Sequence, residues 1–235
     1  MMKLPFMSEQ FFAVFAAYNA AIWPAQIAAY GLGLAVVGML LGDSMIGKRL
    51  VPFILAGIWA WNGIVYHFGF FTPINPMGRG FSALFLLQTI LFVASAISAI
   101  DLRFKVRWDL RSTIGLSLIL YALLIYEVIG YASGHGLMKG PLFGVAPCPT
   151  TIFTIGVLLL ANGRWVIWLA IIPIIWSLIG SSAAGLLGVP EDFGLAVSAG
   201  ALLFVLVKAK LSEALKPNYW HGTTEPNIND KKLTT

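Results

Sequence analysis

Residues 112–132 read STIGLSLILYALLIYEVIGYA, and this stretch decides the fold class. It carries one charged side chain, Glu127. A helix that crosses a hydrocarbon core of ~30 Å needs about 20 mostly apolar residues, which this stretch supplies. Comparable stretches lie at 23–41, 50–71, 81–100, 165–187 and 193–207, and a shorter one lies at 149–162. The sequence therefore predicts an all-α, polytopic bundle of about seven transmembrane helices within residues 23–207.

Composition indicates lipid as the solvent of this chain. Of its 235 residues, 59% are hydrophobic and 11% are charged, whereas a soluble domain carries roughly 25% charged residues. The net charge of +5 does not indicate nucleic acid, because the basic residues lie in the short gaps between apolar stretches. The expected partner is the lipid bilayer. The single cysteine, Cys148, excludes an intrachain disulfide.

The basic residues also predict an orientation, since cationic loops near the ends of spans resist translocation. With seven spans and the N-terminus outside, 12 Lys and Arg residues fall on the cytoplasmic side and 3 fall outside. The cytoplasmic set is Lys48, Arg49, Arg103, Lys105, Arg107, Arg111, Arg164, Lys208, Lys210, Lys216, Lys231 and Lys232, and the outer set is Lys3, Arg79 and Lys139. The predicted topology is N-terminus out and C-terminus in.

Two terminal segments flank the predicted bundle. Residues 1–22 contain a stretch, 8–22, that begins at Ser8 as a candidate N-cap and ends before Pro24. We expect a helix lying at the membrane interface, with continuation into the first span as the alternative. Residues 208–235 are expected to form a cytoplasmic tail, with a short helix followed by a polar, disordered stretch.

Charged and ionisable side chains within apolar spans are costly, so each is a candidate for function. Glu127 lies about 7 Å below the outer interface at 1.5 Å per residue, and His67 lies at a similar depth. His135 falls in an outer loop. Glu191 and Asp192 fall in the turn before the last span, where we expect an acidic N-cap and first helical turn.

The short fifth span extends this outer cluster. Its 14 residues make about 21 Å of helix, roughly 9 Å less than the hydrocarbon core. The preceding loop must then enter the membrane, which requires surrounding protein or a wet cavity. This predicts a broken fifth span, with Cys148 at about the depth of Glu127 and His67.

The run Pro147-Cys148-Pro149-Thr150-Thr151 begins this span. We expect Pro149 at the first helical position and Cys148 at the N-cap, where the helix dipole favours a thiolate. A thiolate could bind a soft metal or act as a nucleophile. The helix N-terminus, with Thr150 and Thr151, could instead receive an anion. The alternative is that Cys148 is a small buried apolar residue. His67, Glu127 and Cys148 are side-chain types that suit a transition metal.

Several runs resemble one family of small bacterial polytopic membrane proteins. They are VFAAYNAAIWPAQ, VYHFGFFTPINP, APCPTTIFTIG and WSLIGSSAAGLLGVPEDFGL. The family is known as a domain of unknown function, and some members carry a permease label. The resemblance covers nearly the whole chain and implies a multi-pass protein of the bacterial inner (plasma) membrane. It implies no catalytic or binding residue.

Three functions are compatible with these features. The first is a permease, or permease-like binding protein, for a small solute or ion, with a pocket near the outer face lined by His67, Glu127, His135, Cys148, Thr150 and Thr151. The second is a membrane-embedded metal-binding protein or enzyme with a His/Glu/Cys site facing the periplasm. The third is a scaffold in which these polar groups join helices.

Overall fold

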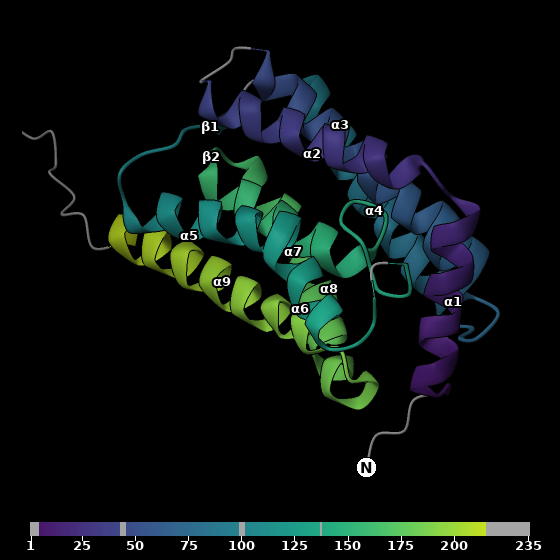
Figure 1. Cartoon of the computed structure of the whole chain (residues 1–235). Helices are drawn as coiled ribbons and strands as arrows, with labels where there is room; N and C mark the ends of the chain where they lie inside the picture. Colours follow the sequence, from purple (N-terminus) through teal and green to yellow (C-terminus); the bar gives the residue numbers. More distant parts are fainter. Residues whose placement is uncertain (1–4, 43–45, 99–101, 137, 215–235) are drawn as a thin grey trace, which may run out of the picture.

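The computed structural model describes residues 5–42, 46–98, 102–136 and 138–214. The predicted all-α class is confirmed, because the described elements are helices apart from two strands of two residues each (Figure 1). Residues 99–100 of the third predicted span and residues 215–235 of the predicted tail lie outside the described residues. The elements are α1 (Ser8–Ala21), α2 (Ala25–Leu41), α3 (Gly47–Trp61), η1 (Asn62–Phe71), α4 (Gly78–Ser98), β1 (Arg103–Phe104), α5 (Leu110–Leu120), η2 (Tyr121–Ile125), α6 (Tyr126–Ala132), α7 (Pro147–Leu160), β2 (Ala161–Asn162), α8 (Trp165–Leu187), η3 (Pro190–Asp192) and α9 (Phe193–Ala214).

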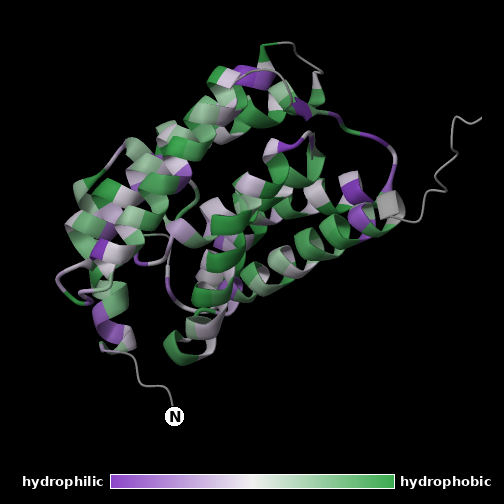
Figure 2. Ribbon diagram, turned by 180° about the vertical axis from the view of Figure 1, so that it is seen from behind, coloured by the Kyte–Doolittle hydropathy of each residue, from purple (hydrophilic) through white to green (hydrophobic). Residues whose placement is uncertain are grey.

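Helix length and composition fit a multi-pass membrane protein. In the described ranges, five helical segments are long and apolar enough to cross a bilayer: Gly47–Phe71, Gly78–Ser98, Leu110–Ala132, Trp165–Leu187 and Pro190–Leu211. α1 and α2 would make a sixth only as one bent span. Large apolar side chains such as Leu178 and Phe204 remain exposed on these helices, and the ribbon is mostly hydrophobic along their length (Figure 2). Such outward apolar faces suit contact with lipid.

Two of the long segments contain π-helical turns that the sequence did not predict. α3 continues into the π-helix η1, and α5 continues through the π-helix η2 into α6. A π-helix bonds each amide to the carbonyl five residues back, so it inserts extra residues without ending the helix. Hydropathy does not register this change, because the apolar run is unbroken. His67 lies in η1.

α7 is the central helix of the bundle. Every residue from 141 to 161 is buried, and α7 contacts α3, α5, α8 and α9. The crossing with α5 is close, because a Cβ added to Gly156 would lie 2.7 Å from the carbonyl oxygen of Gly115. Trp59 of α3 donates from Nε1 to Thr154 Oγ1 at 3.0 Å. Protein therefore surrounds both α7 and the loop that leads into it.

The predicted bounds of α7 are wrong by two residues at each end. The helix begins at Pro147 with Ala146 as its N-cap, so Cys148 lies in the first turn and is not the N-cap. The first four amides of a helix have no intrahelical partner, so prolines at 147 and 149 are both tolerated. The helix ends at Leu160, since Ala161 and Asn162 form β2.

The end of α7 that follows Leu160 is joined to the basic segment before α5. β1 pairs with β2 in antiparallel register, and the amide of Lys105 donates to the carbonyl of Leu160 at 3.0 Å. The guanidinium of Arg111 donates to the carbonyl of Ala161. A cation at this position complements the negative end of the helix dipole. Asp109 caps α5 by accepting from the Ser112 amide at 2.7 Å, which lowers the pKa of that carboxyl group.

α1 crosses the opposite end of the bundle. Its axis makes an angle of 87° with that of α2, and Figure 1 shows it standing across the end of α2. The predicted N-cap, Ser8, is the first helical residue, and Met7 is the N-cap. Gln10 explains this shift, because its side chain accepts from the Met7 amide at 2.9 Å. Phe11 and Phe15 on α1 face inward and are buried.

Candidate functional site

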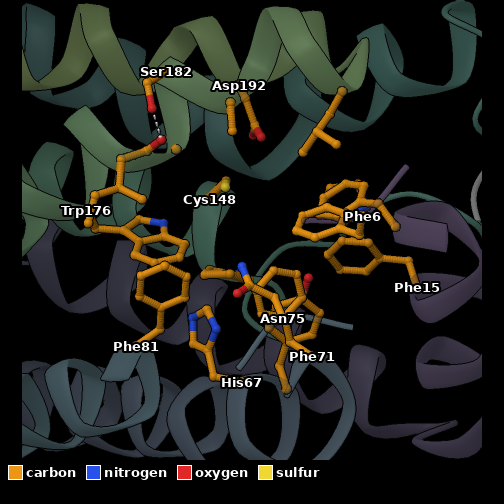
Figure 3. A pocket seen from close by; sticks show the side chains of 18 residues that line it. Phe6, Phe15, His67, Phe71, Asn75, Phe81, Cys148, Trp176, Ser182 and Asp192 are labelled. Atoms are coloured by element: carbon orange, nitrogen blue, oxygen red, sulfur yellow. Dashed lines mark hydrogen bonds between the residues drawn. The ribbon is translucent and has the colours of Figure 1, made fainter. Parts of the chain in front are cut away.

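A cavity of about 150 Å³ lies where α1, η1, α4, α7, α8 and η3 meet (Figure 3). It is at the end of α7 that begins with Pro147, opposite to β2. Seven aromatic side chains contribute to its wall: Phe6, Phe11, Phe15, Tyr66, Phe71, Phe81 and Trp176. The polar side chains in its wall are His67, Asn75, Cys148, Ser182 and Asp192. A mostly apolar cavity with a few convergent polar groups is the usual form of a small-molecule site.

His67 is the most unusual member of this wall. Its side chain is 0% exposed, and neither ring nitrogen has a hydrogen-bond partner among the described residues. Its ring instead contacts aromatic rings, with centroids 4.6 Å from Phe85 and 4.9 Å from Trp176. A buried polar group without a partner costs about 1–3 kcal/mol. A buried imidazole of this kind, placed in a cavity wall, can bind a polar group of a ligand.

Trp176 of α8 shares this feature. Its ring nitrogen Nε1 is buried and makes no hydrogen bond of normal geometry in the part of the chain that the structure describes, and its polar neighbour is the thiol of Cys148, a weak acceptor. Gly180, one turn further along α8, gives room to Leu195 of α9, since a Cβ on Gly180 would lie 2.5 Å from the Leu195 side chain. The same Cβ would lie at ordinary contact distances of 3.8 Å from Trp176 Nε1 and 3.6 Å from Cys148 Sγ. α8 therefore brings the indole and the thiol to the same part of the cavity.

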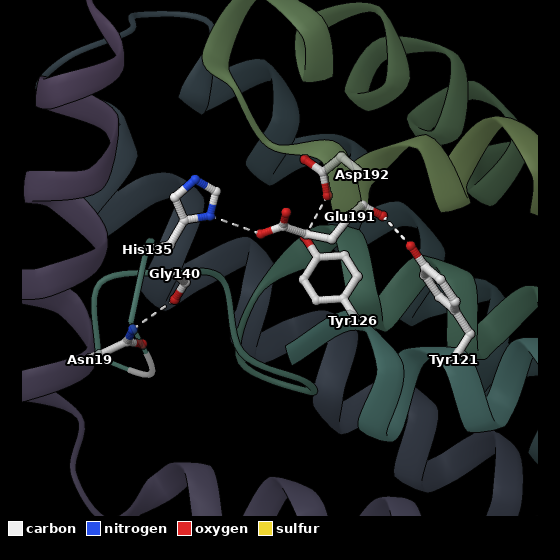
Figure 4. A network of polar contacts seen from close by, with 7 residues as sticks. All are labelled: Asn19, Tyr121, Tyr126, His135, Gly140, Glu191 and Asp192. Atoms are coloured by element: carbon white, nitrogen blue, oxygen red, sulfur yellow. Dashed lines mark hydrogen bonds and ion pairs between the residues drawn. The ribbon is translucent and has the colours of Figure 1, made fainter. Parts of the chain in front are cut away.

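Asp192 supplies the carboxyl group of the cavity. It lies in the 3₁₀ turn η3, is 3% exposed, and interacts electrostatically with the thiol of Cys148. Tyr126 donates from its hydroxyl to Asp192 Oδ1 at 2.5 Å (Figure 4). A charge-assisted hydrogen bond of this kind holds the carboxyl group in a fixed position.

Glu191, the neighbour of Asp192, points away from the cavity toward the loop after α6. Its Oε1 lies 3.1 Å from His135 Nδ1, and its backbone carbonyl accepts from Tyr121 at 2.8 Å (Figure 4). The side chain is 0% exposed, and its second oxygen has no hydrogen-bond partner within the described chain. Phe12 of α1 covers His135, with ring centroids 4.3 Å apart. His135 and Glu191 thus join α1, the loop and η3.

The loop that enters the bundle before α7 is held by side chains from several helices. Tyr18 donates to the carbonyl of Val145 at 2.7 Å. Asn19 donates to the carbonyl of Gly140 at 2.9 Å, and Asn62 donates to that of Gly144 at 3.0 Å. These bonds satisfy carbonyl groups that no water could reach in the interior. They fix the loop that places Pro141 and Cys148 in the cavity wall.

The residues proposed from sequence do not form one cluster. His67 and Cys148 both line the cavity, but Glu127 does not. Glu127 Oε1 instead accepts from Tyr30 at 3.1 Å and from the Phe143 amide at 2.9 Å, so it holds the loop. Its helix turns this carboxylate toward α2.

His135 pairs with Glu191 outside the cavity wall. Thr151 donates to the carbonyl of Pro147 at 2.8 Å, within its own helix. The Thr150 hydroxyl is buried without a partner in the described structure and does not line the cavity. The described residues contain no group of three or more His, Cys, Asp or Glu side chains arranged to hold a metal ion.

Sequence reasoning missed Asp192, Trp176 and Asn75 as members of the site. Asp192 lies in a turn between two spans, so its position suggested a helix terminus and gave no sign of burial. The sequence feature that could have indicated its burial is the acidic pair Glu191-Asp192 after Pro190. Two acidic residues in an apolar region need partners inside the protein. Trp176 gave no separate signal, since Trp is common near the ends of spans.

Comparison with known proteins places the chain in a family without naming an activity. No curated protein matches it, and no solved structure matches it. Residues 8–216 match a family of unknown function, DUF6064, and because this match covers most of the 235 residues, the chain belongs to that family.

Proposed function

We propose that this protein is a permease for a small organic solute, and that the cavity around His67 and Trp176 receives the solute from the outer side of a bacterial inner membrane. The proposal includes seven spans, formed by the five long segments together with α2 and the short α7. It places the N-terminus outside and the C-terminus in the cytoplasm. The excess of Lys and Arg on one side of the chain's spans supports this orientation.

The observation that carries the proposal is the pair of unpartnered ring nitrogens. His67 and Trp176 both line the cavity, and both are buried without hydrogen-bond partners in the described part of the chain. A solute with a polar group between them would satisfy both residues and recover the free energy of their desolvation. In a cavity without a ligand function, these two polar nitrogens would cost free energy and would stabilise nothing.

The form of α7 supports transport over simple binding. Many permeases use a helix that begins inside the membrane, with the solute site at its N-terminus. α7 has 14 residues, begins beside the cavity, and is preceded by a loop buried in protein. A cavity at one end of the bundle is the form expected of one state of a carrier with alternating access. In this account α1, which lies across the cavity end, controls entry.

The metal-binding and enzymatic alternatives have no comparable support. His67 and Cys148 share the cavity, but Glu127 is engaged with Tyr30 and Phe143. The third alternative, a scaffold, would leave the costs of His67 and Trp176 without compensation.

Uptake by reconstituted protein tests the proposal. Proteoliposomes would be offered radiolabelled choline, alanine, lactate and ribose, which represent a cation, a zwitterion, an anion and a neutral sugar. We expect uptake of at least one probe above that of protein-free liposomes. Trp176→Phe removes the N–H donor together with one ring of the indole and should slow this uptake by about tenfold. Trp168→Phe, at an exposed position on the same helix, is the matched control. Equal uptake in liposomes with and without protein would contradict the proposal.

Orientation is tested separately by fusions at Thr235. A fluorescent protein fused there should fluoresce in cells, and an alkaline phosphatase fused there should be inactive, because both outcomes require a cytoplasmic C-terminus. An active phosphatase would place the C-terminus, and with it the basic end of the bundle, outside.

A further inference from the structure

The only formal charge in the cavity wall as described is negative. Asp192 is its only carboxyl group, and no Lys or Arg belongs to the wall as described. The oxygen Oδ1 of Asp192 is occupied by the Tyr126 hydroxyl. Cys148, its other neighbour, offers only a thiol, which is a weak hydrogen-bond donor. A buried carboxylate without a cationic partner in its cavity is costly, and a ligand of opposite charge would remove much of this cost.

The rings of the wall contact one another in a continuous series along the cavity that Asp192 also lines. Phe6 contacts Phe71 edge to face, with centroids 5.5 Å apart. Phe71 stacks on Phe81 at 6.3 Å, and Phe81 contacts Trp176 edge to face at 5.2 Å. Ring faces carry negative electrostatic potential and attract cations within about 6 Å of their centroids. A cage of such rings is a recognised binding site for ammonium groups.

From these two observations we infer that the solute is a small organic ammonium cation, which the aromatic cage surrounds and Asp192 neutralises. This inference rests on the proposed function, since it names the substrate class of the same cavity. The volume of about 150 Å³ suits a molecule of this size, because a cavity of similar volume holds one benzene.

His67 and Trp176 extend the inference to a second group on the ligand. The indole N–H only donates, whereas a neutral imidazole both donates and accepts. Both rings line the same cavity with centroids 4.9 Å apart, and a hydroxyl group is the type of group that can accept from Trp176 and donate to His67. The favoured ligand is therefore an ammonium compound that also carries a hydroxyl group, of which choline is a simple representative.

The same wall disfavours other classes of solute. An anion would lie beside Asp192 in a medium of low dielectric constant, where like charges repel strongly. A neutral apolar molecule could fill the cavity but would leave the Asp192 carboxylate without a countercharge. Charge is thus the property that should decide binding.

Calorimetric titration of the purified full-length chain in lipid nanodiscs tests the inference without requiring transport. The probes are choline and its uncharged isostere 3,3-dimethylbutan-1-ol, which has the same shape and the same hydroxyl group. We expect choline to bind at least about tenfold more tightly, because the aromatic rings and the Asp192 carboxylate attract a cation and not its uncharged isostere. Asp192→Asn should weaken this preference while it retains an acceptor for Tyr126. Asp109→Asn makes the same chemical change at an exposed helix cap and should leave choline binding unaltered.

The outcomes separate this inference from the proposed function. Equal affinity for choline and its isostere, or an unchanged choline preference in Asp192→Asn, would overturn the cation assignment while the cavity remained a solute site. Binding of choline without uptake into proteoliposomes would support the cation site and refute the permease. If Asp192→Asn fails to fold, Phe81→Leu provides the second test, because it removes one ring of the cage and should lower choline affinity several-fold. Unaltered choline affinity in Phe81→Leu would also overturn the assignment.

Discussion

The imidazole of His67 and the indole of Trp176 lie edge to face, with ring centroids 4.9 Å apart, and the ring nitrogens of both are buried without hydrogen-bond partners in the described structure. The two residues come from η1 and α8, more than 100 positions apart in sequence. His67 has no partner in the described structure that offsets its desolvation cost, and Trp176 has only the weak thiol acceptor of Cys148.

His67→Phe should separate stability from function. Phe replaces a polar ring, which has no partner, by an apolar ring that suits its aromatic neighbours. We expect the free energy of unfolding to rise by about 1 kcal/mol or to stay unchanged, because the desolvation cost of the imidazole is removed. Solute binding should be lost. Thermal unfolding in detergent and calorimetric titration check the two parts, and a variant that is strongly destabilised would contradict the account.

Tyr126→Phe should weaken the position of Asp192. The hydroxyl of Tyr126 donates to Asp192 Oδ1 at 2.5 Å, and its removal leaves a buried carboxylate oxygen without this donor. We expect a loss of about 1–3 kcal/mol in the free energy of unfolding. Tyr131→Phe, at a side chain that is 66% exposed, is the matched control and should change stability by less than about 0.5 kcal/mol. Similar losses of stability in the two variants would show that the hydrogen bond from Tyr126 to Asp192 does not stabilise the fold.

Gly156→Ala should disrupt the contact between α5 and α7. The added Cβ would lie 2.7 Å from the carbonyl oxygen of Gly115 and 2.9 Å from a side-chain carbon of Ile119. The two helices must separate, which costs about 1–3 kcal/mol. Gly200→Ala adds a Cβ that meets nothing within 4 Å and serves as the control. The thermal unfolding midpoints of both variants test this prediction. A midpoint for Gly156→Ala equal to that of the unmodified chain would exclude the close crossing of α5 and α7.

Asn19→Ala should loosen the loop before α7. The Asn19 amide donates to the carbonyls of Met138 and Gly140, so its loss leaves two carbonyls without this donor. We expect faster amide hydrogen exchange in residues 138–146 and little change in α4. Exchange measured by mass spectrometry at matched protein concentration checks this. Unchanged protection of the loop would mean that Tyr18 and Asn62 suffice to hold it.

The sequence was sufficient to predict the all-α class and the positions of several apolar helices, because lipid imposes simple requirements. Apolar length predicted helices that coincide with α8 and closely match α4, and the 14-residue stretch predicted a short helix with a buried loop before it. These features depend on backbone hydrogen bonding and hydrophobicity, which are local properties. Local properties also explain why the predicted start of α7 was wrong by two residues. Either Pro147 or Pro149 is compatible with the first turn of a helix, so the sequence alone does not distinguish them.

The site was less predictable, because it depends on which way each helix faces. Glu127 and His67 have similar predicted depths, yet only His67 faces the cavity, since η1 and η2 change the rotation of their segments by π-helical turns. The depth of a residue in the membrane follows from its position in the span. The direction in which its side chain points depends on how the helix packs against helices that are distant in sequence. Asp192 illustrates the same limit, because its burial depends on Tyr126 and Cys148, which lie in two other elements.

The central claim is that the first turn of α7 and the middle of α8 enclose one solute cavity. Gly180→Cys in a Leu195→Ala background tests it most directly. The background removes the Leu195 carbon that would lie 2.5 Å from the new Cβ, and this Cβ would lie 3.6 Å from Sγ of Cys148, the only cysteine of the chain. The measurement is disulfide formation under mild oxidation, detected by mass spectrometry of the unreduced protein, with Gly185→Cys on the same helix as control. The account predicts a disulfide between positions 148 and 180 and none between 148 and 185. Free thiols in oxidised Gly180→Cys, or equal cross-linking in both variants, would contradict it.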